Sequence, residues 1–154
     1  MELSKSELED IREHLKDYLD HPEVKRMSSF IAHGHQSVLK HCFDVAECAY
    51  VLNKKLGMKA DLDVLLPGAL LHDFYLYDWH DRPLSLYIFK MHGYTHPEEA
   101  RSNAVKYFDV NEKIQNVIKS HMWPLTLRSI PRCKEAVLIC MADKICALKE
   151  TFNR

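Results

Sequence analysis

The pair His72-Asp73 closes an apolar run over residues 64–71, and its residue types are those of a metal site. Burying an imidazole beside a carboxylate costs free energy unless a charged or hydrogen-bonding group meets both side chains. A metal ion would meet both, because neutral imidazole and carboxylate are both metal ligands. A second pair, His80-Asp81, lies in a polar, proline-containing stretch where exposed side chains need no partner. The pair at 72–73 is therefore the first candidate for metal chemistry.

Three further polar residues continue apolar stripes at helical spacing: His41, His121 and Asp143. Taken singly, a histidine on an apolar face is more often a hydrogen-bonded core residue than a ligand. An uncompensated buried aspartate is rare, so Asp143 is harder to explain in this way. Together with His72 and Asp73 these residues place five titratable groups on core-facing positions. A shared metal site explains their convergence better than separate coincidences.

The elements that must position these residues are helices. Apolar residues recur at helical spacing along the chain and predict a single-domain, all-α bundle of about six to eight helices. The expected helices cover residues 4–19, 23–31, 37–56, 61–74, 95–108, 112–121 and 132–150. Residues 75–95 are expected to form a long loop with a short helix. Residues 1–30 are expected to be a helical lead-in to the main part, residues 31–150, of one compact domain.

Capping residues set several of the expected helix boundaries. Asp61 is expected to cap the helix that carries the His-Asp pair, and Pro67 should kink that helix or mark its first turn. The segment THPE, residues 95–98, has the spacing of a capping box with proline in the first turn, which predicts a helix start. Either Asp109 or Asn111 is expected to cap the next helix.

Composition narrows the class of protein and its partners. The 154 residues carry a formal net charge of −1 without a dense run of Lys or Arg, which argues against duplex nucleic acid as the main partner. Five cysteines without a close pair, and no signal-type N-terminus, favour reduced thiols in the cytoplasm. No apolar stretch reaches the roughly 18 residues of a membrane span. The amphipathic N-terminal helix could pack on its own domain or on a second copy, which leaves a homodimer open.

The order His41, His72-Asp73, Asp143 on successive helices resembles the HD-domain metal-dependent phosphohydrolases. HCFDVA is similar to the family's H-x-x-x-V-A segment, ALLHDF to its A-L-L-H-D segment and MADKICAL to its closing A-D-K. The segments HGHQSVLKH, HDFYLYDW, THP and HMWPLT resemble a group of small bacterial HD proteins. The resemblance covers about residues 33–148.

The resemblance implies a metal centre with six ligands. These are His41, His72, Asp73, His96, His121 and Asp143. The pattern without His96 and His121 is enough for one metal, and HD proteins with both added histidines hold two metals bridged by the central aspartate. His96 precedes a proline and could also belong to a simple capping turn. Imidazoles and carboxylates without a thiolate favour one or two divalent iron or manganese ions over structural zinc.

Further residues are candidates for catalysis and substrate binding. Many HD enzymes follow the pair with I-G-K, but this chain continues as FYLYDWH, so the role of that lysine has no counterpart here. Lys144 and Arg101 could contact phosphate, and His33 could act as a general acid or substrate contact. Tyr77 and Trp79 could stack on a base. Each also has an ordinary interpretation: a solvated surface cation, a loop-capping histidine or an aromatic lid over the core.

The function implied by the resemblance is metal-dependent hydrolysis of a phosphoester or phosphoanhydride in a small nucleotide or related metabolite. Asp73 would be catalytic because it would contact both ions. A metal-bound water has its pKa lowered from about 15.7 towards 7 and can attack phosphorus. Two alternatives remain: a catalytically silent, metal-retaining sensor or interaction module, and a di-iron oxygenase of the HD type.

Overall fold

The computed structural model describes residues 3–32, 34–78 and 86–152, with the backbone alone for 86–91. Within these ranges the chain forms seven α-helices, one 3₁₀ helix and no strand, which confirms the all-α prediction. The helices are α1 (Lys5–Asp20), α2 (Pro22–Arg26), η1 (Met27–Ser29), α3 (Val38–Leu56), α4 (Leu62–Leu71), α5 (Leu86–Phe108), α6 (Glu112–Ser120) and α7 (Lys134–Phe152).

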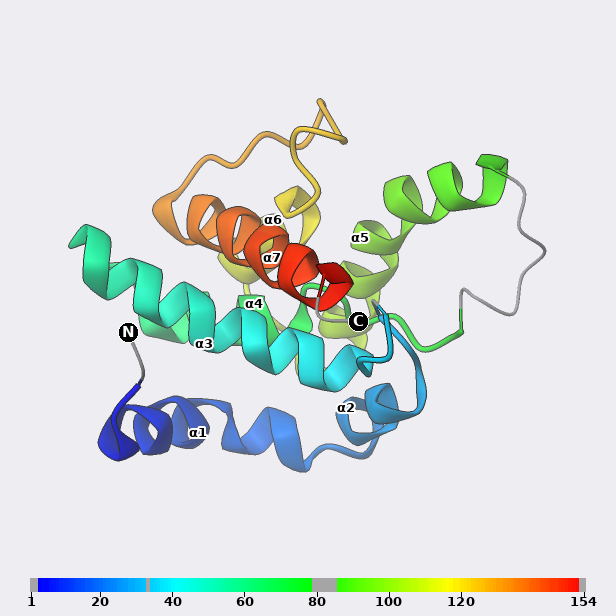
Figure 1. The fold of residues 1–154 in the computed structure, drawn as a ribbon. Helices are drawn as coiled ribbons and strands as arrows, with labels where there is room; N and C mark the ends of the chain where they lie inside the picture. Colours follow the sequence, from blue (N-terminus) through cyan, green and yellow to red (C-terminus); the bar gives the residue numbers. More distant parts are fainter. Residues whose placement is uncertain (1–2, 33, 79–85, 153–154) are drawn as a thin grey trace.

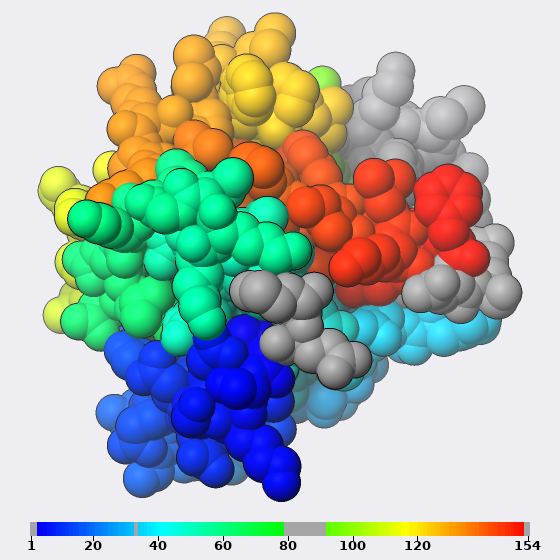
Figure 2. Space-filling view, turned by 60° about the vertical axis from the view of Figure 1, so that its left-hand side comes forward, coloured from blue at the N-terminus to red at the C-terminus, as the bar shows by residue number. Residues whose placement is uncertain are grey.

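Helices α3, α4 and α7 form the centre of the bundle. In Figure 1, α3 crosses the middle of the molecule between α1 below it and α7 above it, and all three central helices pack against one another. Helix α6 packs on α4 and α7, and α5 packs mainly on α6. Figure 2 shows α1 (blue) in contact with α3 and α4. Ile11 and Leu15 of α1 are fully buried, so this helix covers the core.

Helix α4 is apolar on every side, and all of its residues from Val64 to Leu71 are buried. A helix that is apolar all round must lie inside a protein. Gly68 permits close packing there, because a β-carbon on it would lie 2.9 Å from Val117 Cγ1 of α6. Asp61 caps the helix through its side chain, as predicted, and Pro67 lies inside it. The end of α4 therefore delivers the next two residues to the middle of the bundle.

Several predicted helix ends differ from the observed ones. The helix expected over 23–31 is the short α2 followed by η1, after which the chain turns back through a bridge between Ile31 and Ser37. The helix expected over 61–74 ends at Leu71. Asn111 caps α6, whereas Asp109 has a φ of 48° just after α5.

The predicted start of α5 at 95–98 is wrong. The helix begins at Leu86 and runs without interruption through Thr95 to Phe108, with Pro97 in its interior. Figure 1 shows α5 bending along its length. Proline donates no hydrogen bond and its ring crowds the carbonyl four residues earlier, here that of Gly93, which explains a bend. The capping-box spacing was misleading because proline and Thr-x-x-Glu also occur together inside a bent helix.

No helix in the described ranges is both long enough and apolar enough to span a lipid bilayer.

Candidate metal centre

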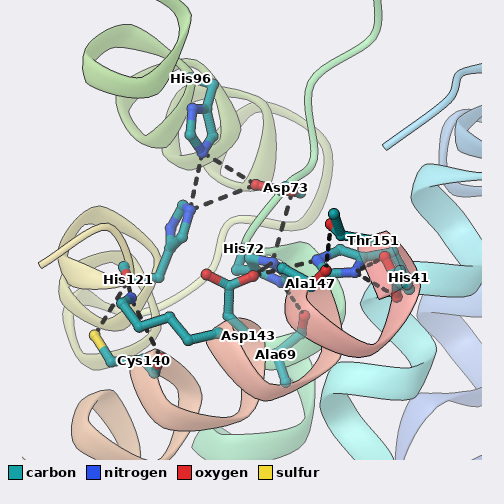
Figure 3. A network of polar contacts seen from close by, with 12 residues as sticks. His41, Ala69, His72, Asp73, His96, His121, Cys140, Asp143, Ala147 and Thr151 are labelled. Carbon is teal, nitrogen blue, oxygen red and sulfur yellow. Dashed lines mark hydrogen bonds and ion pairs between the residues drawn. The ribbon is translucent and has the colours of Figure 1, made fainter. Parts of the chain in front are cut away.

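The six residues predicted as metal ligands lie together in the middle of the bundle (Figure 3). His41 comes from α3, His96 from α5 and Asp143 from α7, while His72-Asp73 and His121 directly follow α4 and α6. All six side chains are buried, and the apolar patterns had indicated this for all of them except His96. Five helices thus converge on a small polar cluster inside an apolar core.

A first group contains His41, His72 and Asp73, whose potential ligand atoms lie within 4.8 Å of one another. Asp143 contacts both imidazoles of this group. Its Oδ1 lies 3.3 Å from Nε2 of His41 and 3.6 Å from Nε2 of His72. Nε2 of His72 is also 3.7 Å from Oδ2 of Asp73. This group could hold one metal ion.

A second group contains Asp73, His96 and His121, again within 4.8 Å of one another. Oδ1 of Asp73 lies 3.2 Å from Nε2 of His96 and 3.4 Å from Nε2 of His121. Asp73 therefore belongs to both groups. Figure 3 shows its carboxylate between His96 and His121 on one side and His72 on the other.

Backbone carbonyls fix the orientation of three of the four imidazoles. The contacts are His72 Nδ1 to Ala69 O, His96 Nδ1 to His92 O and His121 Nδ1 to Ile118 O, each 2.7 Å long. A carbonyl oxygen can only accept, so each Nδ1 carries a proton and Nε2 is the nitrogen available to a metal. Metal-ligating histidines in proteins show this pattern, because the bond at one nitrogen orients the other towards the metal.

The fourth imidazole is held by a carboxylate that sequence reasoning missed. Nδ1 of His41 lies 2.9 and 3.0 Å from the two carboxylate oxygens of Glu150, in the last turn of α7. The backbone of Gly34 packs against this turn, since a β-carbon on Gly34 would lie 3.2 Å from the carbonyl oxygen of Glu150. Glu150 follows Asp143 by two helical turns on the same face of α7, and that spacing was the available signal.

The donor set fits a divalent cation. Nε2 of His96 and Nε2 of His121 lie 2.9 Å apart, so two lone pairs face each other at hydrogen-bond distance. Nε2 of His72 and Oδ1 of Asp73 are buried and make no hydrogen bond to any described residue. A buried polar atom without a partner costs about 1–3 kcal/mol. A cation between the imidazoles and the carboxylate would satisfy these atoms together.

The pKa values of the clustered residues also favour a bound cation. Burial lowers the pKa of His41, but the Asp143 and Glu150 carboxylates outweigh it and raise that pKa to about 10. Burial also opposes the charged form of His72, yet the nearby Asp73 raises its pKa. The pKa values of Asp73 and Asp143 are lowered by the imidazoles despite burial. The carboxylates of Asp73 and Asp143 are therefore ionised, and their negative charges favour a nearby cation. A bound metal would supply this positive charge and displace the protons of the imidazoles.

Comparison with known proteins identifies the family to which the chain belongs. A family model described as the HD domain matches residues 38–148. The chain belongs to the HD-domain family. This membership places it in the metal-dependent phosphohydrolase superfamily that the sequence motifs resembled. Neither the search of curated proteins nor the search of solved structures gave a match. The match to the HD domain includes all six clustered residues and leaves α1, α2 and η1 outside it.

Two predicted phosphate contacts of this HD domain have different surroundings. Nζ of Lys144 donates to the backbone carbonyl oxygens of His121 and Cys140, at 3.1 and 3.3 Å, and therefore lies at the edge of the cluster. The guanidinium of Arg101 instead donates to Glu98 and Gln115, at 2.9 and 3.0 Å. The structure brings Lys144 to the site and ties Arg101 to a pair of side chains on α5 and α6.

Of the residues predicted to stack on a base or to act as a general acid, only Tyr77 lies within the described residues. The hydroxyl of Tyr77 lies 2.9 Å from Nδ1 of His92, and the His92 ring stacks on His96 at a centroid distance of 4.7 Å. Tyr77 is thereby connected to the second group through a histidine that sequence reasoning did not single out. His92 precedes His96 by one helical turn, which is the signal that could have found it. His33, Trp79 and the pair His80-Asp81 lie outside the described residues.

Proposed function

We propose that this HD domain is a metal-dependent phosphohydrolase in which each group would hold one divalent ion, with Asp73 as a ligand common to both groups. The observation that carries the proposal is the division of the cluster into two buried groups that share this single carboxylate. Iron or manganese suits four imidazoles and two carboxylates better than a softer metal. When bound, such ions lower the pKa of a water molecule and polarise the phosphoryl oxygens.

The side chains of the cluster would divide the work of binding and orientation. Asp73 directs Oδ1 towards His96 and His121, and Oδ2 towards His72. The backbone carbonyls behind His72, His96 and His121 orient these imidazoles, and the Glu150 carboxylate orients His41, so that each Nε2 is directed towards the cluster. Two carboxylates against two divalent ions leave the loaded centre positive by about two charges, which attracts a phosphate group.

The substrate that we propose is a small nucleotide or a related phosphorylated metabolite, hydrolysed in the cytoplasm. Lys144 at the edge of the cluster would contact a phosphate oxygen by exchanging its bonds to carbonyl oxygens for a charge-assisted one. Tyr77, half-buried and adjacent to His92, would contact the base or sugar. These assignments support a substrate that lies across the second group.

The first test is elemental analysis of the purified, tag-free protein prepared without chelator, followed by a screen for phosphate release. We expect about two iron or manganese ions per chain, and release of phosphate from a nucleoside phosphate or dinucleotide that stops when the ions are removed. One ion per chain would return the second group to a supporting role. Two ions without hydrolysis of any phosphorylated substrate would favour a metal-retaining sensor, and no metal after reconstitution would refute the site.

A further inference from the structure

A separate cavity lies between α6, the connection 121–133 and the start of α7. It has a volume of about 330 Å³, which is within the range of small-molecule sites. In Figure 2, the connection (yellow to orange) forms the upper edge of the face shown and lies against α7. None of the six clustered residues lines this cavity, although Ser120, which does, directly precedes His121.

The cavity gathers positive charge. Four cationic side chains line it, namely Lys113, Lys119, Arg128 and Arg132, and no described carboxylate does. Lys119 has only a distant partner, since its Nζ lies 3.9 Å from an exposed Glu98 carboxylate. The other three make no ion pair and no side-chain hydrogen bond with any residue in the described ranges. The chain as a whole carries a net charge of −1, so this concentration is local and not a property of the composition.

Neutral donors and a helix end reinforce the charge. The side chains of Asn116, Ser120 and Ser129 also line the cavity. Helix α7 begins at its wall, next to Cys133, so the positive end of the helix dipole lies there. The carboxylate of Glu135, in the first turn of α7, accepts the backbone N–H of Asp61 at 2.8 Å and does not line the cavity.

We infer that this cavity binds a small anion with two or more phosphate groups, at a site distinct from the metal centre. Arginine side chains match phosphate oxygens in a bidentate geometry, and two of the four cations are arginines. An anion would relieve the repulsion among four like charges around one cavity. A concave site of this volume admits a diphosphate or a small nucleotide, whereas a nucleic-acid strand would need an extended groove.

The test is isothermal titration of the metal-free full chain with pyrophosphate and with ADP. We expect both probes to bind, and the double variant Arg128→Gln/Arg132→Gln to weaken binding by about ten- to hundred-fold, the effect of losing charged hydrogen bonds. Both arginines are exposed, so the fold should persist, and a thermal melt checks this. The matched control, Lys5→Gln/Lys55→Gln, removes the same charge from exposed positions elsewhere and should leave binding unchanged.

A second variant separates this site from the metal centre. His121→Ala alters the cluster without removing a cavity cation, so the affinity for pyrophosphate should stay within about two-fold of the wild-type value. Three results would overturn the inference: no binding of either probe at millimolar concentration, equal binding by the arginine double variant, or loss of binding in His121→Ala. Binding of single-stranded RNA without binding of pyrophosphate would also overturn it.

Discussion

The two halves of the metal cluster share Asp73 but differ in what supports them. His41 and His72 of the first group have no exposed surface and come from α3 and the end of α4, in the centre of the bundle. His96 of the second group is 5% exposed and comes from α5, a bent helix that packs mainly on α6. The first group is positioned by the helices that form the centre of the bundle. The two histidines of the second group are positioned by α5 and α6, which pack together at the edge of the bundle.

The two groups also differ in the chemical groups that bind their imidazoles at Nδ1. Nδ1 of His41 is bound to the Glu150 carboxylate, while Nδ1 of each imidazole in the second group is bound to a backbone carbonyl. A carboxylate behind a metal-bound imidazole raises its basicity and hence its affinity for the metal. We therefore expect the first group to bind its ion more tightly, and the second group to lose its ion first. Five variants test this difference.

The largest effect should come from Asp73→Ala, because this carboxylate is shared by both groups. We expect loss of both ions and of all hydrolysis, measured by elemental analysis and phosphate release. Asp63→Ala is the matched control, since this aspartate lies in the first turn of α4, the helix that Asp73 follows, with an exposed side chain. Retention of both ions by the Asp73 variant would show that the carboxylate does not bridge them.

His121→Ala should remove one ion and leave the other, because the first group does not use this imidazole. His41→Ala should instead weaken the first ion. Chelator titration of both variants compares the two groups directly, and His14→Ala on α1, whose Nδ1 bonds to Asp10 O, is the control. Loss of both ions from either variant would mean that the groups are not independent.

Glu150→Gln should weaken the first group without emptying it. The amide keeps the size of the side chain but loses the negative charge, and changes behind a ligand typically cost about 10- to 100-fold in metal affinity. We expect this loss in a competition titration against a chelator, with the second group unaffected. Glu9→Gln, at an exposed position of α1, controls for the change in net charge. An unchanged affinity would reduce Glu150 to a packing role.

Gly68→Ala should disturb the second group more than the first. The new methyl would meet Val117 Cγ1 at 2.9 Å and Ile139 Cδ1 at 3.2 Å, one turn before His72 and His121. Overpacking typically costs about 1–3 kcal/mol, of which alanine's better helix propensity returns up to about 1. We expect net destabilisation of about 1–2 kcal/mol by denaturant unfolding, and faster loss of the second ion. Equal loss from both groups would contradict the idea that α4–α6 spacing matters chiefly for the second.

The sequence predicted the burial of five of the six clustered residues, because helical periodicity indicates which face of a helix is turned inward. His96 had no such pattern and was included through the family resemblance. The prediction from sequence failed at α5, where a local start signal at 95–98 was overridden by the continuous helix. It also missed the partner of His41, because the spacing of Glu150 from Asp143 indicates a shared face of α7 but not a contact with a residue 109 positions away. The division of the ligands into two groups that share one aspartate depends on distances between helices, which no single segment encodes.

The position of Glu150 in the last turn of α7 has a consequence for dynamics. Terminal turns of helices fray readily, and the free energy of local opening there is close to zero. Each opening of this turn would release His41 from its carboxylate, so helix fraying and metal affinity are thermodynamically linked. Gly34, packed against the Glu150 carbonyl, opposes that opening. Hydrogen exchange at the end of α7 should therefore slow when metal binds, which makes a peripheral backbone segment a reporter of the buried centre.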